Sequence, residues 1–290
     1  MTEHSIAGGG YVARIAAFGA ELRGLRSPGG TELIWQAGPA WPKSSPILFP
    51  VVGTLRGDAY RHEGRTYRLG RHGFIRDCGF EWLERGEASA RLAFGDNPAT
   101  RAVYPFAFRF EVDYAIGAEG LRVDYTIHNP GSVPLPASMG AHPAFNWPQR
   151  AGVAKTAHWL RFGADEPTPI RRVDADGLVR ADAVASPVVG RELALHEGLF
   201  ADNAIIIDQL ASRAVRYGAP ETETIEVSWE GLPVLGIWMR PGADFLCIEP
   251  WHGLADPAGF EGEIGDKPWG LIIPPGESRR ATHRIRVVAD

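Results

Sequence analysis

A regular alternation of apolar and polar residues, repeated along the chain, is the feature that most constrains its fold. Residues 108–114 and 121–128 each place an apolar side chain at every second position, between charged or polar neighbours. Successive side chains of a β-strand point to opposite faces, so this pattern predicts strands with one buried face. Residues 115–120, between the two runs, contain two glycines and predict a hairpin connection. The two runs are therefore expected to be neighbouring antiparallel strands.

The same period of two returns at residues 225–229 and 283–288, and two continuous apolar runs, 204–207 and 234–239, predict strands covered on both faces. The 35 glycines and 23 prolines interrupt the chain too often for many long helices. We predict an all-β fold: one large antiparallel β-sandwich, formed by a single domain over residues 1–290, with residues 149–200 as long loops at one rim.

Composition excludes several classes of partner. The formal net charge of -5 gives no basic surface for nucleic acid or for anionic membranes. No apolar run approaches the roughly twenty residues of a membrane span, and residues 1–10 lack the features of a secretory signal, so we expect a cytoplasmic protein. The only cysteines, Cys78 and Cys247, belong to no metal-binding motif, so neither a disulfide framework nor a metal site is predicted.

Three short segments each hold a titratable residue beside glycine or proline and an aromatic residue. His142 lies in residues 140–148, His72 in residues 71–74, and Glu249 in residues 248–253. Glu249 follows an apolar run that predicts a buried strand. Because burial of an unpaired charge is costly, a carboxylate at the end of such a strand indicates either a stabilising partner or a functional role. Histidine titrates near neutral pH, and such groups gather at sites of proton transfer. Each residue alone has an ordinary structural explanation; the three together predict an acid–base site.

The order and spacing of four segments, 46–56, 67–74, 140–145 and 248–251, resemble the aldose 1-epimerase family, also called galactose mutarotases. The nearest likeness is to its shorter, LacX-like bacterial branch, whose pattern reads approximately PxLFPxxG, HGF, GxHPxF and EPW. The resemblance spans the whole chain. It implies a galactose mutarotase-like supersandwich, a reaction without a cofactor and a small-molecule sugar as the partner, in a monomer or homodimer.

Carried over residue by residue, the resemblance makes His142 the general acid and Glu249 the general base. It makes His72 and Arg56 ligands of sugar oxygens, and the segment 200–205 is similar to the one that carries the family's hydroxyl-binding aspartate, here Asp202. Aromatic residues within five positions of the proposed polar groups are candidates for stacking on the sugar ring: Phe74, Phe145, Trp147 and Trp251. Galactose-specific members have GRxxNRI and ETQ where this chain has residues 53–57 and 249–251, which leaves the sugar open.

These residues predict interconversion of the α and β anomers of a free aldohexose by acid–base ring opening and closure. A hexose-6-phosphate 1-epimerase is an alternative, because guanidinium groups suit phosphate and several arginines surround His72: Arg61, Arg65, Arg68, Arg71 and Arg76. The competing explanation for these arginines is a solvated hairpin face. A sugar-binding sandwich without turnover remains a third interpretation. A glycoside hydrolase is disfavoured, since it usually requires two carboxylates and only Glu249 has a suitable setting.

Overall fold

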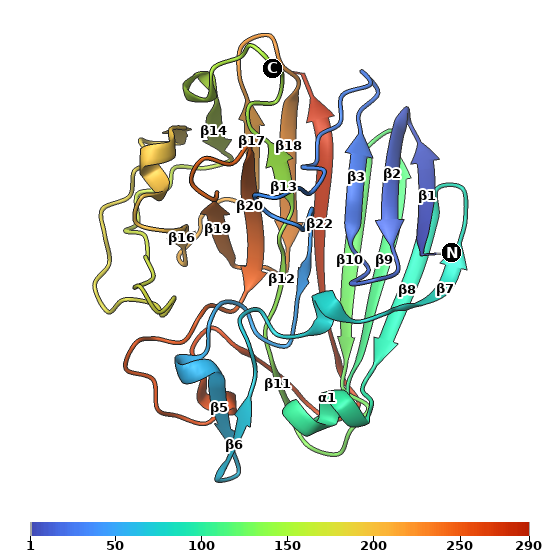
Figure 1. Cartoon of the computed structure of the whole chain (residues 1–290), viewed down its shortest axis with the longest axis vertical. Coiled ribbons are helices and arrows are strands. Elements are labelled where there is room, and N and C mark those ends of the chain that lie inside the picture. The colour runs from blue at the N-terminus through green and yellow to red at the C-terminus, as the bar shows by residue number, and fades with distance from the viewer. Residues whose placement is uncertain (1, 290) are drawn as a thin grey trace.

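The computed structural model describes residues 2–289 and consists mainly of β-strands (Figure 1), with one short helix in that range, α1 (Pro98–Val103). All ladders between the named strands are antiparallel. The largest sheet has nine strands, in this spatial order: β15 (Glu192–Ala194), β14 (Trp159–Phe162), β17 (Ala214–Gly218), β18 (Thr224–Glu230), β22 (Ser278–Val288), β10 (Gly120–His128), β9 (Arg109–Gly117), β8 (Ser89–Gly95) and β7 (Glu81–Arg85).

Two further sheets cover one face of this large sheet (Figure 1). The six-stranded sheet comprises β16 (Ile205–Ile207), β19 (Val234–Trp238), β20 (Phe245–His252), β12 (Met139–Ala141) and β4 (Ile47–Leu48), with β13 (Ala144–Asn146) paired to β20. The three-stranded sheet comprises β1 (Glu3–Gly8), β2 (Tyr11–Ala16) and β3 (Leu22–Arg26). Two small ladders complete the fold: β5 (Ala59–His62) with β6 (Arg65–Arg68), and β11 (Leu135–Ala137) with β21 (Leu271–Ile273).

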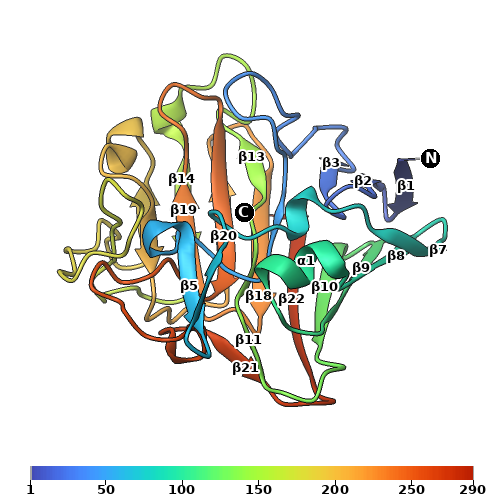
Figure 2. The ribbon, with the colours of Figure 1, turned by 60° about the horizontal axis from the view of Figure 1, so that its bottom comes forward.

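The main hydrophobic core lies between these layers, where Phe110 and Val112 of β9 and Leu246 and Ile248 of β20 belong to one buried cluster. In Figures 1 and 2, the β5–β6 hairpin and α1 lie at the same end of the sandwich. The prediction of a large antiparallel β-sandwich is confirmed. None of the helices within residues 2–289 has the length and apolar character needed to cross a membrane.

Most predicted strands are present near their expected positions. The runs at 108–114 and 121–128 form the neighbouring strands β9 and β10, and their hairpin closes with Gly117 opposite Gly120. The runs at 204–207, 225–229, 234–239 and 283–288 correspond to β16, β18, β19 and β22. The strand predicted from the apolar run before Glu249 was expected to end at Glu249. Instead β20 continues to His252, because Glu249 pairs with Gly236 of β19.

The prediction that residues 149–200 form only loops is wrong in part. Strands β14 and β15 lie within this region and form one edge of the nine-stranded sheet. Their apolar side chains Leu160, Phe162 and Leu193 are buried, and this tertiary packing holds strands of four and three residues that are too short to show a clear period. The three-stranded sheet β1–β3 was not predicted either.

A buried hydrogen bond joins two of the layers and provides a test of the packing. Tyr114 of β9 donates its hydroxyl to the carbonyl of Ala20, between β2 and β3, at 2.7 Å, and both residues are buried. Replacing Tyr114 by Phe leaves that carbonyl without a partner, so the free energy of unfolding should fall by about 1–3 kcal/mol in urea titrations. Tyr67→Phe is the control, because the Tyr67 hydroxyl forms no hydrogen bond within residues 2–289. Equal stability of both variants would contradict this role of Tyr114.

Candidate active site

Glu249 lies in the middle of β20, on the face that points away from the main core. Neighbouring residues Leu246 and Ile248 face the main core, whereas Cys247 and Trp251 belong to separate clusters on the opposite face. Because side chains alternate along a strand, Glu249 shares the face of Cys247 and Trp251. Its carboxyl is nevertheless only 1% exposed, since surrounding loops cover this face.

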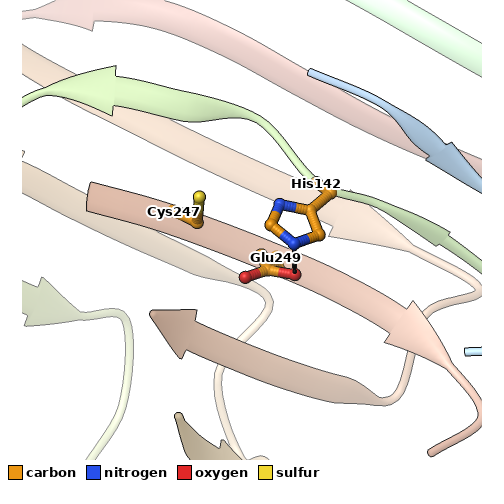
Figure 3. Close-up of side chains that lie close together, drawn as sticks. All are labelled: His142, Cys247 and Glu249. Carbon is orange, nitrogen blue, oxygen red and sulfur yellow. Dashed lines mark ion pairs between the residues drawn. The ribbon is translucent and has the colours of Figure 1, made fainter. Parts of the chain in front are cut away.

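His142 follows β12 directly and reaches over β20 (Figure 3). Its backbone N–H donates to the carbonyl of Pro46 at 3.1 Å, which fixes the chain at this point. The imidazole Nε2 lies 3.0 Å from Oε2 of Glu249. The ring packs beside Trp41 and Trp238, with centroid separations of 5.0 Å and 5.9 Å. A buried imidazole and a buried carboxyl are thus in direct contact.

His72 occupies a loop and has a left-handed backbone conformation, with φ of 65°. Its backbone N–H donates to the carbonyl of Gly53 at 2.9 Å, and the Gly53 N–H donates to its Nδ1 at 3.1 Å. The second bond makes Nδ1 an acceptor, so the proton of the neutral ring is on Nε2. A Cβ at Gly53 would lie 2.6 Å from the backbone nitrogen of Ala255, which explains the glycine. The His72 ring stands nearly perpendicular to that of His142, at 5.7 Å.

Trp251 provides a flat apolar surface beside Glu249. Its ring lies across Gly140 of β12, which pairs with Trp251, and across Gly236 of β19, which pairs with Glu249; a Cβ at either glycine would approach a ring atom to 2.4 Å. Two glycines on flanking strands therefore make room for one indole. Flat aromatic surfaces of this kind pack against the C–H faces of sugar rings.

These residues line one pocket with a volume of about 170 Å³. Its walls are formed by Trp41, Gly53, Arg71, His72, Arg76, His142, Val173, Gly177, Asn203, Ala204, Ile206, Trp238, Glu249, Trp251 and Ala255. Glu249 is the only carboxylic acid in this lining, which is drawn from the described residues 2–289.

Burial is the largest influence on the pKa values of His72, His142 and Glu249 in the pocket. It lowers the pKa of His142 from 6.5 to about 3 and holds the pKa of His72 well below 6.5; the positive charges of Arg76 and Arg71 add to both shifts. Burial also raises the pKa of Glu249 well above its usual range, although Arg71 acts in the opposite direction. In the sugar-free pocket the neutral imidazoles and the protonated carboxyl are favoured. An acid His142 and a base Glu249 require the opposite states at the start of the reaction.

The structure brings together four of the residues singled out in the sequence, namely His72, His142, Glu249 and Trp251. It does not bring Arg56 to this pocket. Its backbone N–H donates to Asp256, its guanidinium pairs with Glu261 at 2.9 Å, and it lines a separate depression.

Asp202 also lies outside this lining. Its side chain is 60% exposed and pairs with Arg180 at 2.9 Å, whereas the next residue, Asn203, lines the pocket. The match of residues 200–205 to the family segment is short, and a shift of one residue in that match replaces Asp202 by Asn203 at the pocket.

Three of the four candidate stacking residues lie in the main core. Phe145 and Trp147 are fully buried there, and Trp147 donates its Nε1–H to a backbone carbonyl at 2.9 Å. Phe74 packs against Phe49 and Tyr104, at centroid separations of 6.3 Å and 6.2 Å. The backbone turns these rings inward, although they are close in sequence to His72 and His142.

Sequence reasoning missed Trp41 and Trp238, which cover His142. No local signal identifies them, because their proximity depends on how the loop that carries Trp41 folds over β19 and β20. Arg71 and Arg76 were considered only as part of a larger arginine cluster. Their closeness to His72 in the sequence is the signal that could have separated them from the other arginines of that cluster.

His142, Cys247 and Glu249 form a compact group in which one potential ligand atom from each residue lies within 4.8 Å of the others (Figure 3). Nitrogen, sulfur and oxygen donors suit Zn²⁺. However, burial raises the pKa of both the Cys247 thiol and the Glu249 carboxyl, and metal ligands must be deprotonated. The group therefore fits proton exchange better than metal binding.

The family model described as "Aldose 1-epimerase" matches residues 3–285. The chromosomal protein LacX of Lactococcus lactis subsp. lactis is 29% identical over 281 residues, which cover 93% of this chain and 94% of the relative. A galactose mutarotase related enzyme from Lactobacillus acidophilus has a TM-score of 0.90 at 28% identity, over 99% of this chain and 97% of that one. A galactose mutarotase-like protein from Lactobacillus casei ATCC 334 has a TM-score of 0.92 at 26% identity, over 99% and 100%.

These similarities extend over nearly the whole chain and agree with the observed fold. They confirm both the galactose mutarotase-like sandwich and the resemblance to the LacX branch. The chain therefore belongs to the aldose 1-epimerase family.

Proposed function

We propose that the protein is an aldose 1-epimerase in which His142 and Glu249 exchange protons with the substrate. The observation that carries this proposal is the 3.0 Å separation of Nε2 and Oε2. Opening of a cyclic aldose removes a proton from the C1 hydroxyl and adds one to the ring oxygen. Both oxygens are bonded to the same carbon, so the acid and the base that serve them must lie close to each other.

The reaction consists of proton transfer and a bond rotation. In ring opening, Glu249 takes the hydroxyl proton, His142 donates to the ring oxygen, and the bond between C1 and that oxygen breaks to give the open-chain aldehyde. Rotation about the C1–C2 bond exposes the other face of the carbonyl. Ring closure on that face reverses the two transfers and yields the other anomer.

The pair carries one proton at every stage of this cycle. Before opening, the proton is on His142; after opening, it is on Glu249. Burial favours the second arrangement in the empty pocket, and Arg71 favours an ionised Glu249. The two arrangements contain the same number of protons and differ only in which of the two groups, 3.0 Å apart, holds the proton. Starting with neutral His142 as the base and Glu249 as the acid is the same cycle with the roles exchanged.

The competing activities have less support. A glycoside hydrolase needs a second carboxyl group, about 5–9.5 Å from the first, and the lining of this pocket within residues 2–289 offers Glu249 alone. A binding module without turnover has no use for a buried pair of acid and base, whose desolvation is costly.

Anomer exchange should be measured by NMR saturation transfer on freshly dissolved aldoses and their 6-phosphates, with the spontaneous rate subtracted. We expect acceleration for at least one sugar. Binding of a sugar without any acceleration would refute the proposal and favour the binding module.

Removal of either proton-transfer group should mainly affect kcat. Glu249→Gln and His142→Asn keep much of the side-chain shape, and each should lower kcat roughly 10²–10⁴-fold. The double variant should be little worse than the poorer single variant, because the two groups act as a unit. Glu261→Gln, at an exposed carboxylate outside the pocket, is the matched control. Wild-type kcat in Glu249→Gln would exclude this mechanism.

The pH profile of kcat/KM should report the buried pair. Because burial lowers the pKa of His142 to about 3 and raises that of Glu249 well above its usual range, the pair keeps its single proton between these two limits. The acidic limb should therefore lie well below 6.5, and activity should decline on the alkaline side only above the usual carboxyl range, as Glu249 loses its proton. A limb near 6.5 that disappears in His142→Asn would contradict this pairing and show that His142 titrates independently of Glu249 with an ordinary pKa.

Catalysis should need no metal ion. Dialysis against EDTA should leave full activity, because the reaction moves only protons and the thiol and carboxyl beside His142 favour their protonated forms. Activity that is lost on dialysis and restored by Zn²⁺ would identify His142, Cys247 and Glu249 as a metal site.

A further inference from the structure

Two arginines of the pocket have little compensation for their charge. The side chain of Arg71 forms no hydrogen bond or ion pair within residues 2–289. Arg76 donates from Nη2 to the carbonyl of Arg71 at 2.9 Å, but its Nε is buried without a partner. The carboxylate with which Arg76 pairs, Asp77, is 3.7 Å away and is held by Lys43 at 2.8 Å.

Nothing else in the pocket neutralises these charges. Glu249 is the one carboxyl group of the lining, and its burial favours the uncharged form. The positive field is felt by its neighbours, because Arg71 and Arg76 both lower the pKa of His72 and of His142. A neutral sugar would leave this field uncompensated.

Most other arginines with an acidic residue in reach form closer ion pairs than Arg76; the exceptions are Arg14 and Arg61, at 3.9 Å and 3.8 Å. Arg56 pairs with Glu261 at 2.9 Å. Arg180 pairs with two carboxylates, Asp182 at 3.0 Å and Asp202 at 2.9 Å. A chain with a net charge of -5 has acidic residues available for such pairs, yet in the pocket lining drawn from residues 2–289 the only one is Glu249, which forms no ion pair with Arg71.

We propose that the aldose bound in this pocket carries a negatively charged group, a phosphate ester or a carboxylate, which Arg71 and Arg76 bind. The proposal rests on the proposed function and specifies its substrate class. A guanidinium donates parallel hydrogen bonds to two oxygens of such a group. This favours the hexose 6-phosphate over the free aldohexose of our sequence analysis and adds uronates, while Arg61, Arg65 and Arg68 lie outside the pocket lining.

The direct test compares three sugars that share one ring. Anomer exchange is measured for the free hexose, its 6-phosphate and its uronate, in the gluco and galacto configurations. We expect kcat/KM to be at least about tenfold higher for an anionic sugar than for the hexose of the same configuration. The 6-phosphate and the uronate distinguish the two sources of charge. Equal or faster turnover of the neutral hexoses would overturn the proposal and leave the proposed function standing.

Binding is measured separately, so that the two proposals fail independently. Trp41, Trp238 and Trp251 line the pocket, so quenching of tryptophan fluorescence by glucose 6-phosphate, galactose 6-phosphate or a uronate reports occupancy. Tighter binding of an anionic sugar without anomer exchange would support the charge preference and refute the epimerase. Binding that does not distinguish anionic from neutral sugars would refute the charge preference.

Substitution of the two pocket arginines tests whether they bind the anionic group of the substrate. Arg71→Gln and Arg76→Gln should each reduce the preference for the anionic sugar roughly 10–100-fold, mainly through KM. The ratio between anionic and neutral sugars is the appropriate readout, because Arg71 also acts on Glu249 and any such effect cancels in the ratio. Arg56→Gln, which removes an arginine paired outside the pocket, should leave the ratio unchanged. An unchanged ratio in both pocket variants would overturn the assignment, and Arg71→Gln tests it without disturbing a protein contact.

Discussion

The burial of a carboxyl group in the middle of a β-strand is the constraint on which this site depends. Glu249 is 1% exposed, and a charged carboxylate in such a position is costly unless other groups stabilise it. The surrounding structure meets that demand with polar groups from distant segments: His142 after β12 and Arg71 in the loop that precedes η2 (Ile75–Asp77). Neighbouring strands contribute glycines, which allow the indole of Trp251 to lie flat beside the carboxyl.

The sequence predicted the architecture because most strands have one face in the core and one in solvent, and this produces a period of two. Strands such as β9 and β10 follow that rule along their whole length. Short strands do not: β14 and β15 are defined by their neighbours in the sheet. Similarly, the end of β20 could not be located from its apolar run, because the strand continues through a buried polar residue.

Within the site, the sequence identified the residues whose chemistry depends on local context and missed those whose role depends on packing. His72, His142 and Glu249 stand in short segments in which glycine or proline fixes the backbone. Trp41 reaches the same pocket only through the fold of a distant loop. Proximity in sequence was also a poor guide for aromatic residues, since Phe145 is three positions from His142 and yet points into the main core.

The acid–base chemistry and the charge of the pocket follow from the same desolvation. Burial that favours a protonated Glu249 in the empty site also removes the negative charge that the pocket lining within residues 2–289 could set against Arg71 and Arg76. Burial is the main cause of the lowered pKa of His142, and an anionic group bound by these arginines would offset the part that their charges add, which favours the imidazolium form. The same anion would weaken the stabilisation of an ionised Glu249 by Arg71, so its favourable effect falls on His142 alone. Ring opening begins from a protonated His142, so under our proposal the charge of the substrate helps to prepare the acid, while the ionised Glu249 depends on its contact with His142.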